Sequence, residues 1–410
     1  MPVDSRFAAW CGVCDWNVDP AEPAEEPGRL ARVRRTLARR HGERLLAEVS
    51  AGGALRPGKD TSALLAHGIA LAVHGVTVAL VAGGVWCVVG GWGNPVVVVA
   101  GLFLVALGWS LRPRLPRLPK DALLLYRADA PALYGLIDEI ARVAGTRSVD
   151  VIAVDADVNA SVTTCGVRGH RLLTLGLPLW ETLEHRQRIA LLGHELGHYS
   201  NGDTRRGAVF GTAYRSLTIW HYYLEPTEDP APLEMLANLV YLVPRSLVSG
   251  LLMLLDQLTL RSKQRAEYLA DSVAAQAGST EAAVELLDRL LVAESVHIAL
   301  RRESIRLRAL PRSAGRSEGR QDGLWEVLAA HVESIPEHEY ERQRRVGARR
   351  GHSVDDTHPP TDQRRACLLV GAPVPAAVVS DADREQRIAA ELADARGQVA
   401  RQIVRDGVDG

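Results

Sequence analysis

The residues best suited to chemistry lie in one short stretch, 193–198, which reads GHELGH. On a helix, His194 and His198 project from one face about a turn apart, because they are four residues apart. Two neutral imidazoles in that arrangement can hold one Zn²⁺, and Glu195 beside them can act as general base on a water that the metal activates. The stretch is short, so a surface helix with two ordinary histidines is the alternative.

A zinc ion held by two histidines needs a third protein ligand and keeps a fourth position for water. Further along, a helical stretch carries Glu267, a carboxylate of the right type, and Asp271 lies four residues later on the same face. Asp271 could accept a hydrogen bond from the free ring nitrogen of a zinc histidine and so fix its tautomer. An ordinary charged helix face is the alternative for this pair.

Charge and cysteine content limit the classes of protein that fit. The chain has 410 residues, with 48 Lys and Arg against 49 Asp and Glu. There is no overall basic excess, so no nucleic-acid partner is expected. Five scattered cysteines argue against a disulfide framework and favour a reducing compartment. The first 60 residues are polar and charged, which predicts that no cleavable signal peptide is present.

An uncharged segment predicts how the chain meets a membrane. From Ser62 to Leu111 there is no Asp, Glu, Lys or Arg, and a turn sequence interrupts the segment at 90–95. Residues 63–89 are long enough to cross a bilayer, and residues 95–111 are just long enough. We therefore predict a transmembrane hairpin over 61–111, with a buried hairpin in a soluble domain as the alternative.

Basic residues on both sides of this hairpin predict its orientation. The turn itself has no charge, so the positive-inside rule places both flanks in the cytoplasm. The prediction is a multi-pass protein of the cell (inner) membrane whose catalytic domain faces the cytoplasm. We predict either two or four membrane spans, because the apolar segments within residues 207–258 contain Arg215 and Arg245 and either cross the membrane or do not. The flanking basic residues are Arg44, Arg56, Lys59, Arg112, Arg114, Arg117 and Lys120.

Sequence periodicity predicts an α+β fold that is mainly helical. Residues 149–154, 159–164 and 171–175 read as short strands, the last two forming a hairpin, and residues 181–200 form the helix with the histidines. The expected organisation, in chain order, is a cytoplasmic N-terminal segment with a basic helix (1–60), the hairpin (61–111), a domain that carries the candidate zinc site (121–370) and a C-terminal helical extension (371–410).

Four motifs in order make the chain resemble the HtpX / CAAX-prenyl-protease family of membrane zinc metallopeptidases, which belong to the gluzincins. The resemblance covers about residues 121–369. The motifs are Asn159-Ala160-Ser161, the histidine stretch followed by Asn201-Gly202-Asp203-Thr204, Glu267-Tyr268-Leu269-Ala270-Asp271, and Thr357-His358-Pro359-Pro360-Thr361 with Arg364. Ser161 departs from the family, which usually has an aromatic residue there.

The resemblance implies a zincin-like domain with one catalytic Zn²⁺. His194, His198 and Glu267 would be its ligands, and Glu195 would activate the water and later pass a proton to the leaving amine. Asp271 would support a ligand from behind.

The resemblance also assigns residues to substrate binding. Asn159 and Ala160 would lie on an edge strand, packed on the histidine helix, that pairs with an extended substrate backbone. His358 and Arg364 would steady the oxyanion or the wall of the active site, although His358 could instead only cap a helix.

Three functions remain open from the sequence. The first is an endopeptidase that cleaves membrane or misfolded proteins in quality control, with polypeptide substrates and the lipid bilayer as partners. The second is a CAAX-type protease that processes prenylated C-terminal peptides. The third is a non-catalytic membrane scaffold, which retention of the ligands and of Glu195 disfavours.

A separate Cys-x-x-Cys, Cys11 and Cys14, lies near the N-terminus between Trp10 and Trp16. Two thiolates are half of a tetrahedral zinc site, and the chain contains no second Cys-x-x-Cys. We expect a disordered tail with an unused pair, with a structural Zn²⁺ at Cys11 and Cys14 as the alternative.

Overall fold

The structure is a computed structural model that describes residues 4–20, 29–51, 61–119, 122–166, 168–200, 203–227, 230–309, 317–350 and 359–407. The chain forms two compact units. The first, called here the sheet unit, comprises Met1–Pro57, Arg117–Gly202 and Gln264–Gly410. The second, called the apolar unit, comprises Gly58–Pro116 and Asp203–Lys263.

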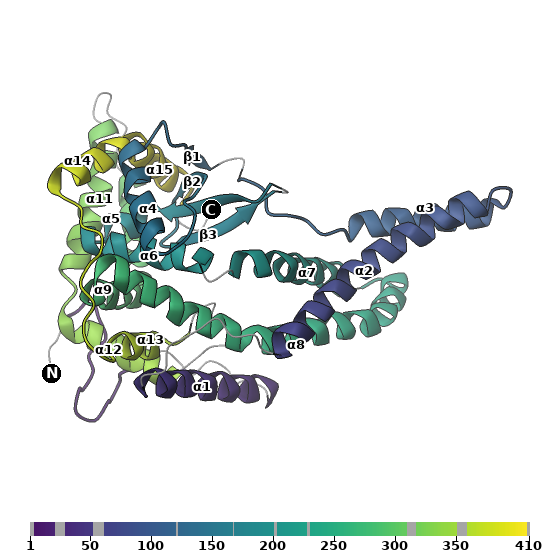
Figure 1. Ribbon diagram of the computed structural model, residues 1–410, viewed down its shortest axis with the longest axis horizontal. Helices are drawn as coiled ribbons and strands as arrows, with labels where there is room; N and C mark the ends of the chain where they lie inside the picture. The colour runs from purple at the N-terminus through teal and green to yellow at the C-terminus, as the bar shows by residue number, and fades with distance from the viewer. Residues whose placement is uncertain are drawn as a thin grey trace. The chain divides into compact units, whose positions relative to one another are not determined.

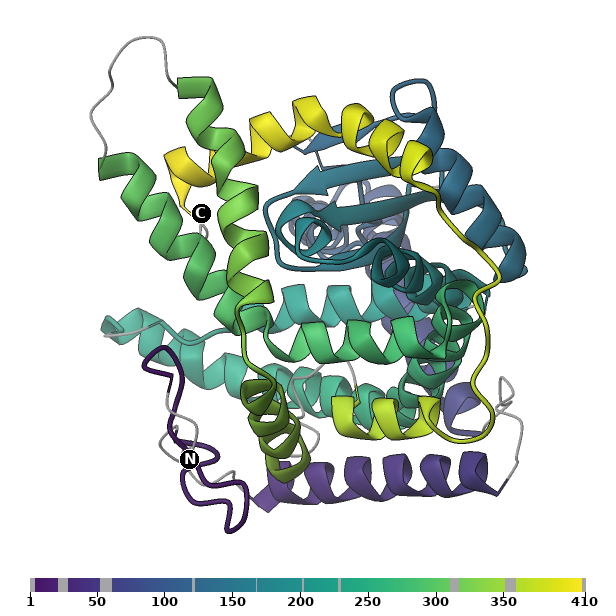
Figure 2. The same cartoon turned by 90° about the vertical axis from the view of Figure 1, so that its left-hand side faces the viewer.

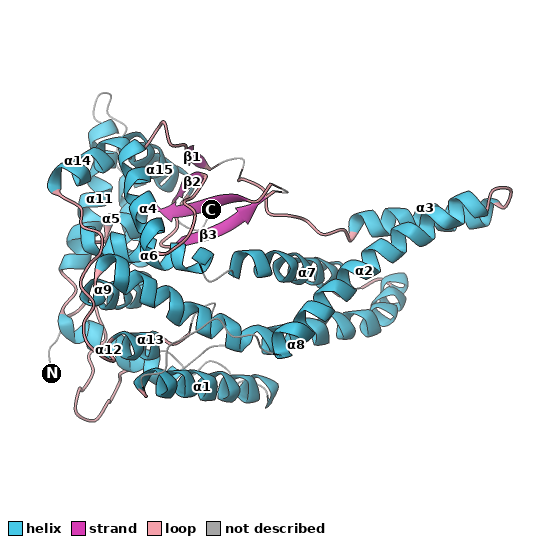
Figure 3. Cartoon of the chain, viewed as in Figure 1, coloured by secondary structure: helices cyan, strands magenta, loops and turns pink. Residues whose placement is uncertain are grey.

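The sheet unit contains a four-stranded mixed sheet with the strand order β1-β2-β4-β3 (Figure 3). The central pair, β2 and β4, is parallel, and the two outer pairs are antiparallel. The predicted hairpin is confirmed as β3 and β4, while β1 was not predicted. The strands are β1 (Leu123–Leu125), β2 (Val151–Asp155), β3 (Ala160–Cys165) and β4 (His170–Gly176).

Helices make up most of the sheet unit (Figures 1 and 2). The predicted basic helix, the helix with the histidines, the helical stretch with Glu267 and the helical C-terminal extension are all present, but the sequence did not predict the highly charged helix α12. They are α1 (Arg29–Ser50), α4 (Pro131–Val143), α5 (Leu177–Glu181), α6 (His185–Ser200), the end of α8 (Pro232–Gly278), α9 (Thr280–Leu291), α10 (Ala293–Ala309), α11 (Ser317–Glu333), α12 (Glu337–Arg350), α13 (Thr361–Leu368), α14 (Ala382–Glu391) and α15 (Ala393–Asp406).

One hydrophobic core joins the sheet to these helices. Ile137 of α4, Leu173 of β4 and Leu192 of α6 are all almost completely buried in it. Ile388 of α14 and Ile403 of α15 belong to the same core, and Figure 2 shows these two yellow helices alongside the sheet. The C-terminal helices therefore help to hold the sheet unit together, because they bury apolar surface in its centre.

A hydrogen bond from α6 connects this helix to the sheet. The hydroxyl of Tyr199, one residue after His198, lies 2.7 Å from the carbonyl oxygen of Thr163 on β3 and 3.1 Å from that of Leu172 on β4. Burial raises the pKa of the Tyr199 hydroxyl, so it stays a donor at neutral pH. The helix with the histidines is thereby held at the β3 side of the sheet.

The apolar unit contains α2 (Thr61–Gly90), α3 (Pro95–Ser110), α7 (Asp203–Tyr223) and the first part of α8. Two helical stretches, Leu64–Gly90 and Glu234–Gly278, are long and apolar enough to cross a membrane, and α3 is apolar but shorter. Many large apolar side chains of this unit are exposed, which fits contact with lipid better than with water. Examples are Trp86, Val89, Phe103, Leu239 and Val243.

Helices α2 and α3 run antiparallel and touch backbone to backbone. Asn94 begins α3, and its side chain accepts a hydrogen bond from the N–H of Val96 at 3.1 Å. A Cβ added at Gly84 would lie 2.7 Å from the carbonyl oxygen of Gly101, and a Cβ added at Gly101 would lie 2.7 Å from that of Gly84. Small residues allow this approach, as is common between membrane helices.

This contact predicts different effects at two neighbouring glycines. Gly84→Ala must push α3 away from α2 and should destabilise the pair by about 1–3 kcal/mol. Gly83→Ala should be neutral or slightly stabilising, because a Cβ there meets nothing within 4 Å. Thermal unfolding of the two variants in detergent tests this prediction. Equal melting temperatures would mean that the Gly84 contact does not stabilise the pair.

Candidate metal centre

The site is built where α6 and the last part of α8 come into close contact within the sheet unit. A Cβ added at Gly197 would lie 2.8 Å from the Cα of Ala270, and one added at Gly193 would lie 3.0 Å from the Cα of Ala274. Real Cβ atoms essentially never show the first distance, and the second is tighter than nine in ten real Cβ contacts, so the absence of a side chain at Gly197 and Gly193 allows this approach. The close contact brings the side chains between these positions together.

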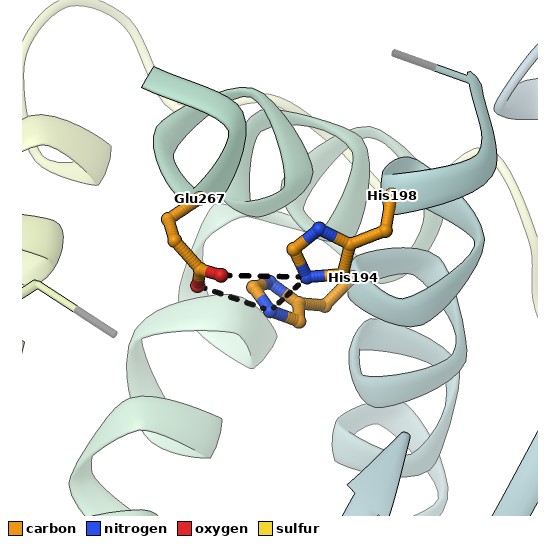
Figure 4. Close-up of side chains that lie close together, drawn as sticks. All are labelled: His194, His198 and Glu267. Carbon is orange, nitrogen blue, oxygen red and sulfur yellow. Dashed lines mark hydrogen bonds and ion pairs between the residues drawn. The ribbon is translucent and has the colours of Figure 1, made fainter. Parts of the chain in front are cut away.

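Ligand atoms of three residues meet at this contact (Figure 4). The Nε2 atoms of His194 and His198 are 3.2 Å apart. The Nε2 of His194 lies 3.6 Å from Oε2 of Glu267, and the Nε2 of His198 lies 3.6 Å from Oε1. Atoms bound tetrahedrally at 2.0–2.1 Å from one zinc ion lie about 3.3–3.4 Å from one another. The distance between the two Nε2 atoms is close to that value, and one ligand atom from each of the three residues lies within 4.8 Å of the others, so these residues can hold a metal ion.

Asp271 contacts His194, one of the candidate ligands, and Arg364 in turn contacts Asp271. Asp271 Oδ1 is 3.0 Å from Nδ1 of His194, and the Arg364 guanidinium donates to both carboxylate oxygens, at 2.8 Å from Nε and 2.6 Å from Nη2. When His194 carries its proton on Nδ1, it donates to Asp271 and its Nε2 lone pair faces His198 and Glu267. The hydrogen bond from Nδ1 of His194 to Asp271 therefore fixes the orientation of the imidazole, and Arg364 holds Asp271 in place.

Charges in this buried group shift its pKa values in a consistent way. Burial raises the pKa of Asp271, but the charge and hydrogen bonds of Arg364 outweigh it and hold the pKa well below its usual range. Burial also lowers the pKa of His194, but the hydrogen bond to Asp271 and the negative charges of Asp271 and Glu267 together outweigh it, so this pKa is raised. Asp271 is thus ionised at neutral pH and available as the acceptor for His194.

The remaining predicted catalytic residues are placed as follows. Glu195 is buried on α6, one residue after His194, and its role as a general base stays a prediction. Arg364, on α13, contacts Asp271, and its Nη1 lies 3.8 Å from Glu267 Oε2. His358 lies outside the described residues. The predicted contact of His358 and Arg364 with a developing oxyanion stays a prediction.

Asn159 and Ala160 lie where strand β3 begins. Ala160 is the first residue of β3 and pairs with Leu175 of β4. The Asn159 side chain accepts a hydrogen bond from the N–H of Ala160 at 2.9 Å. Among the described residues β3 is paired on one side only, so it is an edge strand of the sheet. Its use by a substrate stays a prediction.

Two features of the site were not anticipated from the sequence. One is the packing of Gly193 and Gly197 against Ala270 and Ala274, for which the four-residue spacing of small residues on both helices was an available signal. The other is the pairing of Arg364 with Asp271, residues 93 positions apart. No local sequence pattern predicts the contact between Arg364 and Asp271.

Two histidines and a glutamate form a ligand set that metal-dependent hydrolases use, and the two histidines share their helix, α6, with a further glutamate, Glu195. The family model of peptidase family M48 matches residues 129–369, more than half of the chain. The protein therefore belongs to peptidase family M48, a family of metallopeptidases. No curated protein is significantly similar to the chain. No solved structure is significantly similar to it either.

The pairing with Asp271 predicts that Arg364 is needed for stability. Arg364→Gln leaves a buried carboxylate without its cation, and loss of one partner of a buried pair costs about 3–5 kcal/mol. Arg365→Gln is the matched control, because Arg365 follows directly on α13 but is partly exposed, 3.4 Å from Asp288. It should cost less than about 1 kcal/mol.

Chemical denaturation measures the stability of both variants, and metal titration measures their affinity for the metal. Arg364→Gln should also weaken metal affinity about 10–100-fold, because Asp271 no longer orients His194 firmly. Similar unfolding midpoints for the two arginine variants would contradict this role of Arg364.

Proposed function

We propose that this protein is a membrane-bound, zinc-dependent endopeptidase. The observation that carries the proposal is the convergence of His194, His198 and Glu267, each of which offers a ligand atom within 4.8 Å of the other two. Two imidazoles and one carboxylate form a ligand set that suits zinc and leaves one position for a water or substrate. Membership of a peptidase family supports peptide-bond hydrolysis as the reaction.

The chain's own residues can supply the proton transfers of this reaction. A zinc ion held by His194, His198 and Glu267 would polarise the scissile carbonyl and make a water easier to deprotonate. Glu195 accepts the proton of the attacking water and later delivers it to the leaving amine. Asp271 keeps the Nδ1 proton of His194 in place, and Arg364 keeps Asp271 ionised. Burial of Glu195, His194 and Glu267 strengthens all of these interactions, because the local dielectric is low.

Strand β3 is our candidate for the substrate-binding edge. The N–H of Gly176 donates to the carbonyl oxygen of Asn159 at 2.9 Å, and in an antiparallel pair such bonds alternate along the strand. The backbone groups of Val162 and Thr164 therefore point away from β4. An extended peptide can pair with them without regard to its side chains, which suits an enzyme for unfolded segments.

The membrane part of the proposal is based on the apolar unit. Helices α2 and α8 each contain a stretch that could span a membrane, and we propose that α3 completes a transmembrane hairpin with α2. The basic flanks of the hairpin support an orientation with the peptidase site facing the cytoplasm of an inner membrane. Substrates would then be membrane-associated or unfolded polypeptides, as in protein quality control, with no nucleic-acid partner.

Two other functions remain as outcomes of the tests below. A CAAX-type protease would act on prenylated C-terminal peptides and not on a general unfolded protein. A non-catalytic scaffold would keep the fold and bind no substrate for cleavage. The presence of Glu195 together with all three ligands disfavours the scaffold, because a scaffold has no use for a general base in this position.

Substitution of Glu195 separates chemistry from metal binding. Glu195→Gln should keep about one zinc ion at the His/His/Glu centre and should lower the rate of casein cleavage by at least about 10²–10⁴-fold, since general-base catalysis is lost. Glu184→Gln is the control, because Glu184 is an exposed glutamate just before α6. Metal analysis and cleavage assays of purified protein in detergent measure both effects. Undiminished cleavage by Glu195→Gln would exclude the mechanism.

Cysteine accessibility tests the proposed membrane topology. Trp92 is exposed in the turn between α2 and α3, and Asp383 is exposed at the start of α14. In intact cells, a membrane-impermeant maleimide should label Trp92→Cys but should label Asp383→Cys only after permeabilisation. Glu225→Cys, in the loop between α7 and α8, distinguishes two spans from four when labelled in the same way. Labelling of Asp383→Cys in intact cells would reverse the proposed orientation.

A further inference from the structure

A second pair of metal-ligating side chains lies in the N-terminal segment 4–20 of the sheet unit, outside the His/His/Glu centre. The expectation of a disordered tail is wrong for this segment, because it packs on α12. Trp10 and Val18 form a small buried cluster with Val346 of that helix. Arg342 donates to the carbonyl oxygen of Val18 at 2.8 Å. Cys11 and Cys14 are therefore presented on a folded support.

The loop that carries the two cysteines is closed by its own backbone. The N–H of Asp15 donates to the carbonyl oxygen of Cys11 at 2.9 Å, and the N–H of Cys11 donates to that of Trp16 at 3.0 Å. These bonds close a short turn that contains both Cys11 and Cys14, so the two thiols are held on one ordered loop.

Ion pairs connect the loop to α12. Arg345 donates to the carbonyl oxygen of Gly12 at 2.7 Å and to Asp15 at 2.7 Å, and Arg349 lies 3.0 Å from the other oxygen of Asp15. Arg345 also donates to Glu341 of α12 at 2.8 Å, so the two guanidinium groups are matched by two carboxylates. These ion pairs fix the cysteine loop on α12.

The tip of the loop exposes apolar surface around the thiols. Cys14 is exposed, and the neighbouring Val13 and Trp16 have 96% and 60% of their surface open to solvent. Apolar side chains exposed together at a potential ligand indicate a surface that a partner covers. The partner must also bring metal ligands, because two thiolates do not complete a structural zinc site.

We propose that Cys11 and Cys14 are half of a tetrahedral Zn²⁺ site, and that the same two residues of a second copy of this chain complete it. Among the residues the structure describes, the His/His/Glu centre is the only group of three or more His, Cys, Asp or Glu placed to hold a metal, so a third ligand for Cys11 and Cys14 is absent from the described chain. A second copy related by a two-fold axis supplies two thiolates in matching geometry. It also covers Val13 and Trp16 of both copies.

The proposal predicts a zinc-dependent dimer of the full-length protein in detergent. Wild type should bind about three zinc ions per two chains, and Cys11→Ser/Cys14→Ser should bind about one per chain and be monomeric. A chelator should dissociate the wild-type dimer, whereas a thiol reductant should not. Cys87→Ser, which removes a cysteine from α2, is the control and should leave the dimer unchanged. Metal analysis and light scattering after size-exclusion chromatography measure these outcomes.

Cobalt substitution tests the sulfur ligands separately from the peptidase site. Co²⁺ in the wild type should show thiolate-to-cobalt charge-transfer absorption, which the double serine variant lacks, because the His/His/Glu centre has no sulfur. Cys14→His keeps a ligand and should keep the dimer with a weaker charge-transfer band. The inference is overturned by a missing band, by a band in a monomer, or by a dimer that reductant dissociates. None of these outcomes depends on peptidase activity.

Discussion

The close contact of helices α6 and α8 is the constraint on which the site depends. Gly193 and Gly197 let the backbone of α6 approach Ala270 and Ala274, and only at this separation can two imidazoles of one helix meet a carboxylate of the other. Tyr199 then connects the same helix to the sheet, next to the edge strand β3. Backbone packing thus sets the geometry of the metal centre and its position relative to the edge strand. Side-chain movement alone could not produce this arrangement.

Burial of so many ionisable groups requires a balance of charge. Glu267 and Asp271 lie a turn apart on α8, and Arg364 is the buried cation that pairs with Asp271. With both histidines neutral, the group keeps a net negative charge, which a divalent cation can offset. The same arginine comes from α13, near the end of the family match, so residues late in the chain complete the ionic environment of ligands that occur much earlier.

Much of the fold could be predicted because its signals are local. The β3–β4 hairpin, helix α1 and the helix with the histidines follow from alternation, periodicity and turn residues within short windows. Strand β1 was missed because three residues carry too little pattern. Helix α12 was missed because its charged sequence, with arginines and glutamates on most faces, has little apolar periodicity, and its stability comes from ion pairs and from contact with the N-terminal segment.

The sequence by itself determined which residues can do chemistry. The four-residue spacings of His194 and His198 and of Glu267 and Asp271 place each pair on one helix face, since helical geometry is local. Only the tertiary structure decided that these two faces meet, that Arg364 pairs with Asp271, and that the Cys11 loop is folded on α12. Those contacts join residues tens to hundreds of positions apart, and they form because packing and charge pairing act through space, without a signature in the neighbouring sequence.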